Sequence, residues 1–141
     1  MKRFTLYLST TLLMLSAAPA FGSIIQWKVE GGGNNHHYQL LEDERTQLAA
    51  EIQSGQLSYG GITGHLATIG TAEENLFLTT TLGTEALSGK WLGGFQPMFS
   101  PEPDESWGWT TGEEWLYTNW ADGQPEATLP PGNGLRFSSS G

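Results

Sequence analysis

The stretch GHLATIGTAEENLFLTTTL, residues 64–82, combines the clearest local signals in this chain. Its short apolar run, residues 66–69, predicts a β-strand. Thr71 follows, with Glu74 three residues later, and this spacing is the capping-box pattern that begins a helix. We therefore expect a strand at 66–69, a turn, and a helix over 72–82.

The segments that precede this unit predict a hairpin and a further helix. Residues 24–29 and 36–41 alternate between apolar and polar side chains, and glycines and asparagines at 31–35 separate them. This pattern is typical of two antiparallel strands joined by a turn. A helix is expected over 43–52, whereas the glycine-rich residues 54–64 are turn-like.

The segments that follow are aromatic and predict more strands. Residues 91–95 predict a strand, and the three prolines within 96–104 predict a loop. Residues 107–110 and 115–117 alternate aromatic and smaller side chains around a glycine-containing turn, which predicts a second hairpin. Residues 135–137 alternate like the start of a last strand.

Tryptophan is concentrated in one short segment. Four of the six tryptophans lie between residues 107 and 120, so this segment is expected to lie at the centre of the core. Trp91, Trp109 and Trp120 are expected to be core residues. Trp107 and Trp115 remain open between a core position and a platform on which a sugar ring stacks.

The N-terminus predicts export. Two basic residues precede an apolar run over 4–15, and small residues follow at 16–22. This order is that of a secretory signal peptide. We assign residues 1–22 to it, with cleavage after Ala20 or Gly22, and residues 23–141 to one domain that is secreted, periplasmic or extracellular. The apolar run is too short to span a membrane, so no span is expected after cleavage.

The amino-acid composition argues against nucleic acid as a partner and excludes disulfide bonds. Without residues 1–22 the chain holds four basic and fifteen acidic residues, a formal net charge of −11. Phosphate backbones would repel so acidic a domain, so nucleic-acid binding is not expected. The chain has no cysteine, so packing of its 6 Trp, 6 Phe and 4 Tyr has to hold the core without disulfides.

Several of these segments, in the same order, resemble C-type-lectin-like domains. Residues 64–77 resemble the family's strand and second helix, and Trp-Leu-Gly-Gly at 91–94 looks like its Trp-Ile-Gly-Leu signature. Residues 107–126 resemble the stretch that leads to its calcium-site loop. The sequences of these segments are most similar to the bacterial, cysteine-free branch of the family. The resemblance covers residues 24–141 and implies an α+β fold with two helices and small antiparallel sheets.

The chain departs from this family in two places. Residues 46–64 are longer and richer in glycine than the family's first helix. Residues 135–141 resemble the strand that leads into the family's Trp-Asn-Asp loop, but that loop and the closing strand do not follow. We therefore expect a domain truncated at its C-terminus, with the last strand or strands missing.

The resemblance also implies a site. In sugar-binding members, the residues on either side of a cis-proline hold a calcium ion, and vicinal hydroxyls of the sugar coordinate the same ion. Here those positions are Gln124, Pro125 and Glu126, with Asn133 as a further candidate ligand. Gln-Pro-Glu is nearer the galactose-type Gln-Pro-Asp than the mannose-type Glu-Pro-Asn.

Calcium is a possible cofactor, but its site looks incomplete. Calcium takes about 6–8 oxygen ligands, and Gln124, Glu126 and Asn133 offer about half of them. No acidic residue follows Glu126 in the chain. A plain solvated turn around Pro125 is the alternative interpretation.

Catalytic carboxylates are the rival interpretation of four glutamates. Glu73, Glu74, Glu113 and Glu114 form two neighbouring pairs, as the acid and base of glycoside cleavage could. The first pair, however, suits the first turn of a helix, where acids favour the helix dipole, and the second suits a hairpin turn. An enzyme is therefore not expected.

The remaining hypotheses concern binding. Adjacent His36 and His37 point to opposite faces of a strand, so they do not indicate a metal site. The favoured function is an exported carbohydrate-binding, lectin-like module. The alternatives are a calcium-independent lectin-like domain that binds a cell-surface protein or has a structural role, and a truncated, inactive product.

Overall fold

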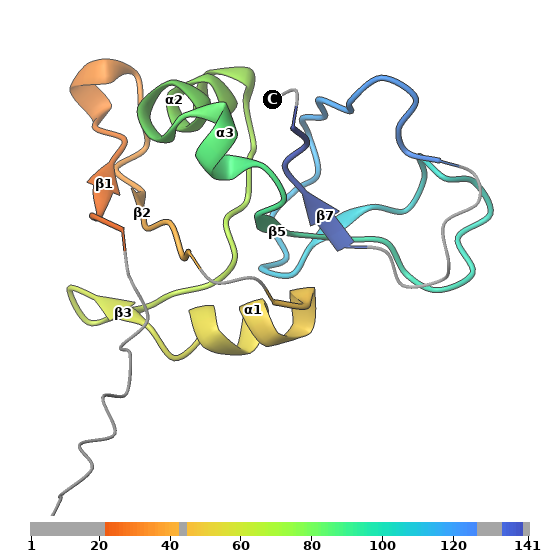
Figure 1. Ribbon diagram of the computed structural model, residues 1–141, viewed down its shortest axis with the longest axis horizontal. Helices are drawn as coiled ribbons and strands as arrows, with labels where there is room; N and C mark the ends of the chain where they lie inside the picture. Colours follow the sequence, from red (N-terminus) through yellow and green to blue (C-terminus); the bar gives the residue numbers. More distant parts are fainter. Residues whose placement is uncertain (1–21, 43–44, 127–133, 140–141) are drawn as a thin grey trace, which may run out of the picture.

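A computed structural model describes residues 22–42, 45–126 and 134–139 (Figure 1). Short helices and small antiparallel sheets alternate along the chain, so the α+β class is confirmed. In chain order the elements are β1 (Ile25–Gln26), the 3-10 turn η1 (Val29–Gly31), β2 (His37–Tyr38), α1 (Gln47–Ser54), β3 (Ser58–Tyr59), β4 (Ile62–Thr63), α2 (Ala72–Leu82), α3 (Thr84–Leu87), β5 (Trp91–Phe95), β6 (Gly108–Trp109) and β7 (Gly134–Arg136).

The helix α2 begins and ends where the sequence predicts. The hydroxyl oxygen of Thr71 accepts a hydrogen bond from the backbone N–H of Glu74 (3.1 Å), as in a capping box. Gly83, with φ of 86°, ends the helix in a conformation that most side chains disfavour. Leu78 is the most deeply buried side chain of α2 and attaches the helix to the core.

The expected number of two helices is wrong, because a third helix follows directly. After Gly83 the chain forms the single turn α3, whose Leu87 is buried in the core. A four-residue turn has too little periodicity to stand out in the sequence. Burial of one leucine stabilises it instead.

The helix α1 also begins later than predicted. It runs from Gln47 to Ser54 rather than over 43–52, because the Thr46 side chain accepts a hydrogen bond from Ala49 N (3.3 Å) and caps it. Residues 43–44 lie outside the described part. The Nε2 atom of Gln47 donates to the carbonyls of Leu92 (3.1 Å) and Gly94 (2.9 Å), which fixes α1 against β5. None of the described helices has the length and apolar character needed to cross a membrane.

Two small hairpins lie near the N-terminal end. The first, β1–β2, confirms the predicted hairpin, with Ile25 opposite Tyr38. The second, β3–β4, lies in the segment interpreted as turn-like. Gly60 (φ 59°) and Gly61 (φ 83°) form its two-residue turn, because glycine adopts the left-handed conformation that such turns require.

The central sheet has the order β6-β5-β7. The predicted strands at 91–95 and 135–137 are confirmed as β5 and β7, the latter one residue earlier. The segment predicted as a strand at 66–69 is not one. It touches β5 through a hydrogen bond from Gly93 N to Ala67 O (2.9 Å) without forming a ladder.

The predicted hairpin between 107–110 and 115–117 is wrong. Trp109 pairs with Gly94 of β5 instead, and residues 115–117 form no strand. A Cβ atom at Gly94 would lie 2.8 Å from Leu135 Cβ and 3.2 Å from the Trp115 ring. The bare glycine therefore lets Trp115 pack onto the face of the sheet, where it cannot extend the edge as a strand.

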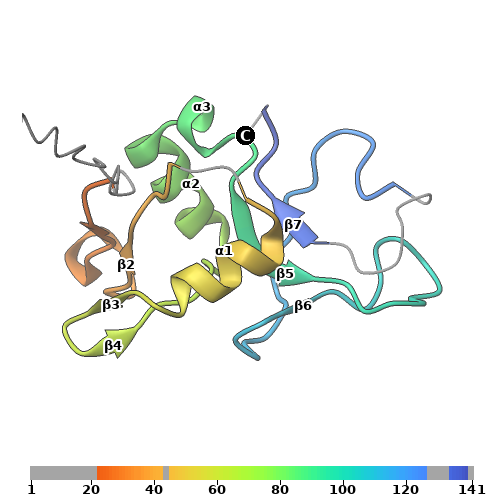
Figure 2. The same ribbon diagram turned by 60° about the horizontal axis from the view of Figure 1, so that its bottom comes forward.

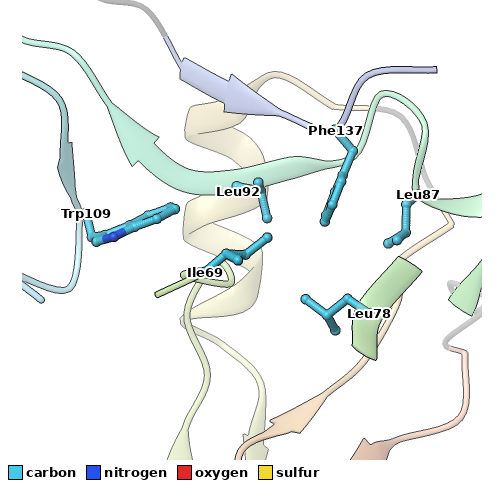
Figure 3. Packing of buried hydrophobic residues seen from close by; sticks show 6 residues of the cluster. All are labelled: Ile69, Leu78, Leu87, Leu92, Trp109 and Phe137. Atoms are coloured by element: carbon cyan, nitrogen blue, oxygen red, sulfur yellow. The ribbon is translucent and has the colours of Figure 1, made fainter. Parts of the chain in front are cut away.

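One apolar core joins these elements. Figure 3 shows six side chains that point toward one another on one side of β5; they are Ile69, Leu78, Leu87, Leu92, Trp109 and Phe137. The expected core position is confirmed for Trp109, whereas Trp91 and Trp120 are only half-buried. Trp107 is buried, and Trp115 is half-buried against the core.

Candidate functional site

The loop that carries Gln124, Pro125 and Glu126 presents two polar side chains together. A hydrogen bond from Gln124 N to Ala121 O (2.9 Å) closes a turn just before it. The Gln124–Pro125 peptide bond is cis, as the resemblance implies. Gln124 Nε2 donates to Glu126 Oε1 (3.2 Å), and both side chains are exposed. Both polar groups can therefore contact one ligand. Asn133, the further candidate, lies outside the described residues.

This loop forms one wall of a large hollow. The hollow has a volume of about 1010 Å³, and Gln124, Pro125 and Glu126 line it. Asn119 and Asp122, which the sequence analysis did not single out, line it as well. The feature of the sequence that could have identified them is their position in the same short polar stretch, directly before the proline.

Aromatic rings also line the hollow. Trp107 is buried, and its Nε1 donates to Pro103 O (2.9 Å). Trp115 stacks on it with ring centroids 5.9 Å apart, and Trp120 lies 5.0 Å from Trp107 and 6.3 Å from Trp115. Trp115, Tyr117 and Trp120 are half-buried and border the hollow. The question left open by the sequence thus has two answers: Trp107 is a core residue, and Trp115 is both packed and available at a surface.

The described part of the loop offers carboxylate and amide oxygens to the hollow. Asn119, Asp122, Gln124 and Glu126 are the side chains of the loop that line the hollow with amide or carboxylate groups, and two of them are carboxylates. Within the described part of the chain, no three His, Asp or Glu side chains gather closely enough to hold a metal ion. Calcium takes about 6–8 oxygen ligands, which carboxylates, amides, backbone carbonyls and water can supply.

Glu74 serves a structural role. Only 4% of its surface is exposed. One carboxylate oxygen accepts a hydrogen bond from the Tyr38 hydroxyl, and the other accepts one from Gly70 N (2.8 Å). Burial and the bond to Glu74 raise the pKa of Tyr38 well above its usual value. Glu74 therefore ties the β1–β2 hairpin to the start of α2.

The other three glutamates line a hollow together with Glu74. Glu73, Glu113 and Glu114 are exposed and, with Glu74, line a second hollow of about 540 Å³. The structure thus brings together two pairs that are far apart in the sequence. Glu74 is already committed to two hydrogen bonds within the protein.

The two neighbouring histidines diverge, as predicted. His36 Nδ1 lies 3.8 Å from Glu74 Oε1, whereas the His37 ring lies 4.8 Å from the ring of Tyr59. They do not share a site.

Comparisons with known proteins point to lectins. No protein-family model and no solved structure matches the chain. An alpha-N-acetylgalactosamine-specific lectin of Patiria pectinifera is 30% identical over 96 residues, which are 66% of this chain and 54% of that protein. A lectin of Pleurodeles waltl is 30% identical over 96 residues, 67% of this chain and 52% of that protein. The chain spans about half the length of these curated relatives. Over about two thirds of its own length, this chain is lectin-like in sequence.

Proposed function

We propose that this chain is an exported C-type-lectin-like domain that binds carbohydrate in the larger hollow. One observation carries the proposal: half-buried aromatic rings and paired polar side chains line the same hollow. A sugar ring has an apolar face and a rim of hydroxyl groups, so it suits such a combination of surfaces. The similarity to two lectins supports the same function.

The polar wall would bind hydroxyl groups directly. The Gln124 amide and the Glu126 carboxylate already lie within hydrogen-bonding distance of each other. One hydroxyl could therefore accept from the amide and donate to the carboxylate at the same time. Trp115 and Trp120, which line the same hollow, would contact the C–H face of the ring.

Calcium would contribute little to this binding. Only two of the four side chains that the described loop offers are carboxylates, and we expect calcium affinity to be no tighter than about 1 mM, the weak end for extracellular modules. The domain is proposed to bind its ligand without cleaving it; the glutamates considered as a catalytic acid and base, Glu73, Glu74, Glu113 and Glu114, line the other hollow.

N-acetylgalactosamine is the first sugar to test. One relative is specific for alpha-N-acetylgalactosamine by name. The Gln-Pro-Glu sequence of this chain is also nearer the galactose-type than the mannose-type motif, by the resemblance described above.

Calorimetric titration tests the proposal. The purified exported protein is titrated with N-acetylgalactosamine, galactose and mannose, each with 5 mM calcium and with a chelator, at about 25 °C. We expect N-acetylgalactosamine to bind, mannose to bind at least tenfold more weakly, and the chelator to have little effect.

Matched variants assign the binding to this hollow. Glu126→Ala is expected to weaken binding at least tenfold, because it removes an acceptor that contacts Gln124. Glu114→Ala changes an exposed acid of the other hollow and should leave affinity unchanged. Absence of binding to these sugars and to a broad glycan array, or equal affinities for the two variants, would disprove the proposal.

A further inference from the structure

A loop beside the candidate site presents an exposed phenylalanine. We refer to residues 96–106, between β5 and β6, as the Phe99 loop. Figures 1 and 2 show this segment extending from the sheet at the end of the molecule away from the β1–β2 and β3–β4 hairpins. Phe99 is 85% exposed, the highest value for a large apolar side chain in the described residues, and the adjacent Met98 is 58% exposed.

The backbone of Phe99 is strained. Its φ is 68°, in the left-handed region, which bulky residues rarely adopt. Such strain persists only where the surrounding structure imposes it, and it occurs preferentially at functional positions. An exposed ring contributes nothing to the core, so folding alone does not account for a phenylalanine at this position.

Two buried side chains hydrogen-bond within the Phe99 loop. Gln96 is 6% exposed, and its Nε2 donates to three carbonyl oxygens: Glu102 (3.0 Å), Pro103 (3.1 Å) and Glu105 (2.9 Å). Trp107 Nε1 donates to the same Pro103 carbonyl (2.9 Å). One buried amide and one buried indole therefore hold the loop in shape. These hydrogen bonds reduce the conformational entropy that the loop would lose on binding a partner.

The charge of the loop identifies the kind of partner. Glu102, Asp104 and Glu105 are exposed, and residues 96–106 contain no basic residue. An apolar tip with an acidic flank is complementary to an apolar pocket with a basic rim. The same charges disfavour an anionic lipid surface or another copy of this acidic chain.

We infer that the Phe99 loop is a docking site for a protein partner that inserts Phe99 into an apolar pocket flanked by lysine or arginine. This surface is separate from the polar wall of the hollow, and the inference does not depend on sugar binding. Phe99 is the anchor, and the acidic flank supplies the attraction that orients the partner.

Selection from a random 12-residue phage-displayed peptide library tests the inference. The full exported chain serves as bait, and Phe99→Gly serves for counter-selection. We expect enriched peptides that combine basic with large apolar residues. Synthetic versions should bind Phe99→Gly at least tenfold more weakly than the unaltered chain. The double variant Glu102→Gln, Asp104→Asn should bind more weakly and with a smaller dependence on salt.

Two controls separate docking from folding. Glycine accepts a φ of 68° freely, so Phe99→Gly should unfold at the same or a higher temperature than the unaltered chain. Ile62→Ser alters a side chain that is 76% exposed on β4, far along the chain from the loop, and should leave peptide binding unchanged.

Four results would overturn the inference. They are a selection that yields no peptide sensitive to Phe99→Gly, equal losses in Phe99→Gly and Ile62→Ser, Phe99-dependent binding to phosphatidylcholine vesicles in place of peptides, and Phe99-dependent self-association in sedimentation measurements. The last two would assign the loop to a lipid surface or to a second copy of the chain.

Discussion

Replacing Glu74 by alanine is expected to destabilise the domain far more than replacing its neighbour Glu73. Both residues lie in the first turn of α2 and look alike in the sequence. The structure separates them, because Glu73 is exposed and Glu74 is 4% exposed. Of these two glutamates, only Glu74 hydrogen-bonds to the β1–β2 hairpin, through the Tyr38 hydroxyl.

The magnitude follows from the hydrogen bonds that are lost. The Glu74 carboxylate accepts from the Tyr38 hydroxyl and from Gly70 N, and a hydrogen bond to a charged group contributes about 1.5–3 kcal/mol. The alanine variant leaves both donors without this acceptor in a half-buried place. We therefore expect a loss of about 3–5 kcal/mol in the free energy of unfolding, a large share of the roughly 5–15 kcal/mol typical of a domain.

Urea denaturation followed by tryptophan fluorescence measures this loss. Glu73→Ala is the matched control and should cost about 0.3–1 kcal/mol, since it removes one exposed charge near the helix dipole. Glu74→Gln retains one carbonyl acceptor and should fall between the two. If Glu74→Ala and Glu73→Ala lowered stability equally, the proposed role of Glu74 in joining the hairpin to α2 would be refuted.

Three further outcomes are expected. Gly94→Ala should lower stability by about 1–3 kcal/mol in thermal denaturation, because the added Cβ would lie 2.8 Å from Leu135 Cβ, and an unchanged midpoint would contradict this packing. Thr71→Ala should cost about 1 kcal/mol through loss of the N-cap bond to Glu74 N, which circular dichroism during urea unfolding would detect. The raised pKa of Tyr38 means that the unfolded chain loses this proton first, near pH 10, so stability should fall as pH rises above 10, by up to about 1.4 kcal/mol per pH unit. Tyr38→Phe should remove that part of the slope between pH 10 and 11, and a slope unchanged by the substitution would argue against the buried hydroxyl.

One part of the candidate site, the polar loop, consists of residues that are neighbours in the chain. The other part, the aromatic wall, depends on contacts between distant residues. Gln124 and Glu126 flank one proline, so their proximity follows from adjacency in the sequence, and the resemblance identified them as candidates. The aromatic wall could not be placed in this way. Whether Trp115 lies in the core or at a surface depends on which strand it meets, and the spacing of tryptophans along the chain does not contain that information.

The sequence by itself determined the elements whose signals are local. The cap at Thr71 and the first turn of α2 involve residues three apart, so the bounds of α2 could be predicted. The strand at 91–95 and the β1–β2 hairpin also follow from alternation and a nearby turn. Each of these features depends on interactions between neighbours in the chain.

Only the tertiary structure decided how these elements pair and which acid is buried. Trp109 pairs with Gly94 and not with the segment at 115–117, although the aromatic alternation fits either partner. Glu74 and Glu73 have the same local preference, yet Tyr38, 36 residues away, contacts only the first of them. Local preferences leave such choices nearly equal in energy. The free energy of burial, which depends on residues far apart in the chain, selects between them.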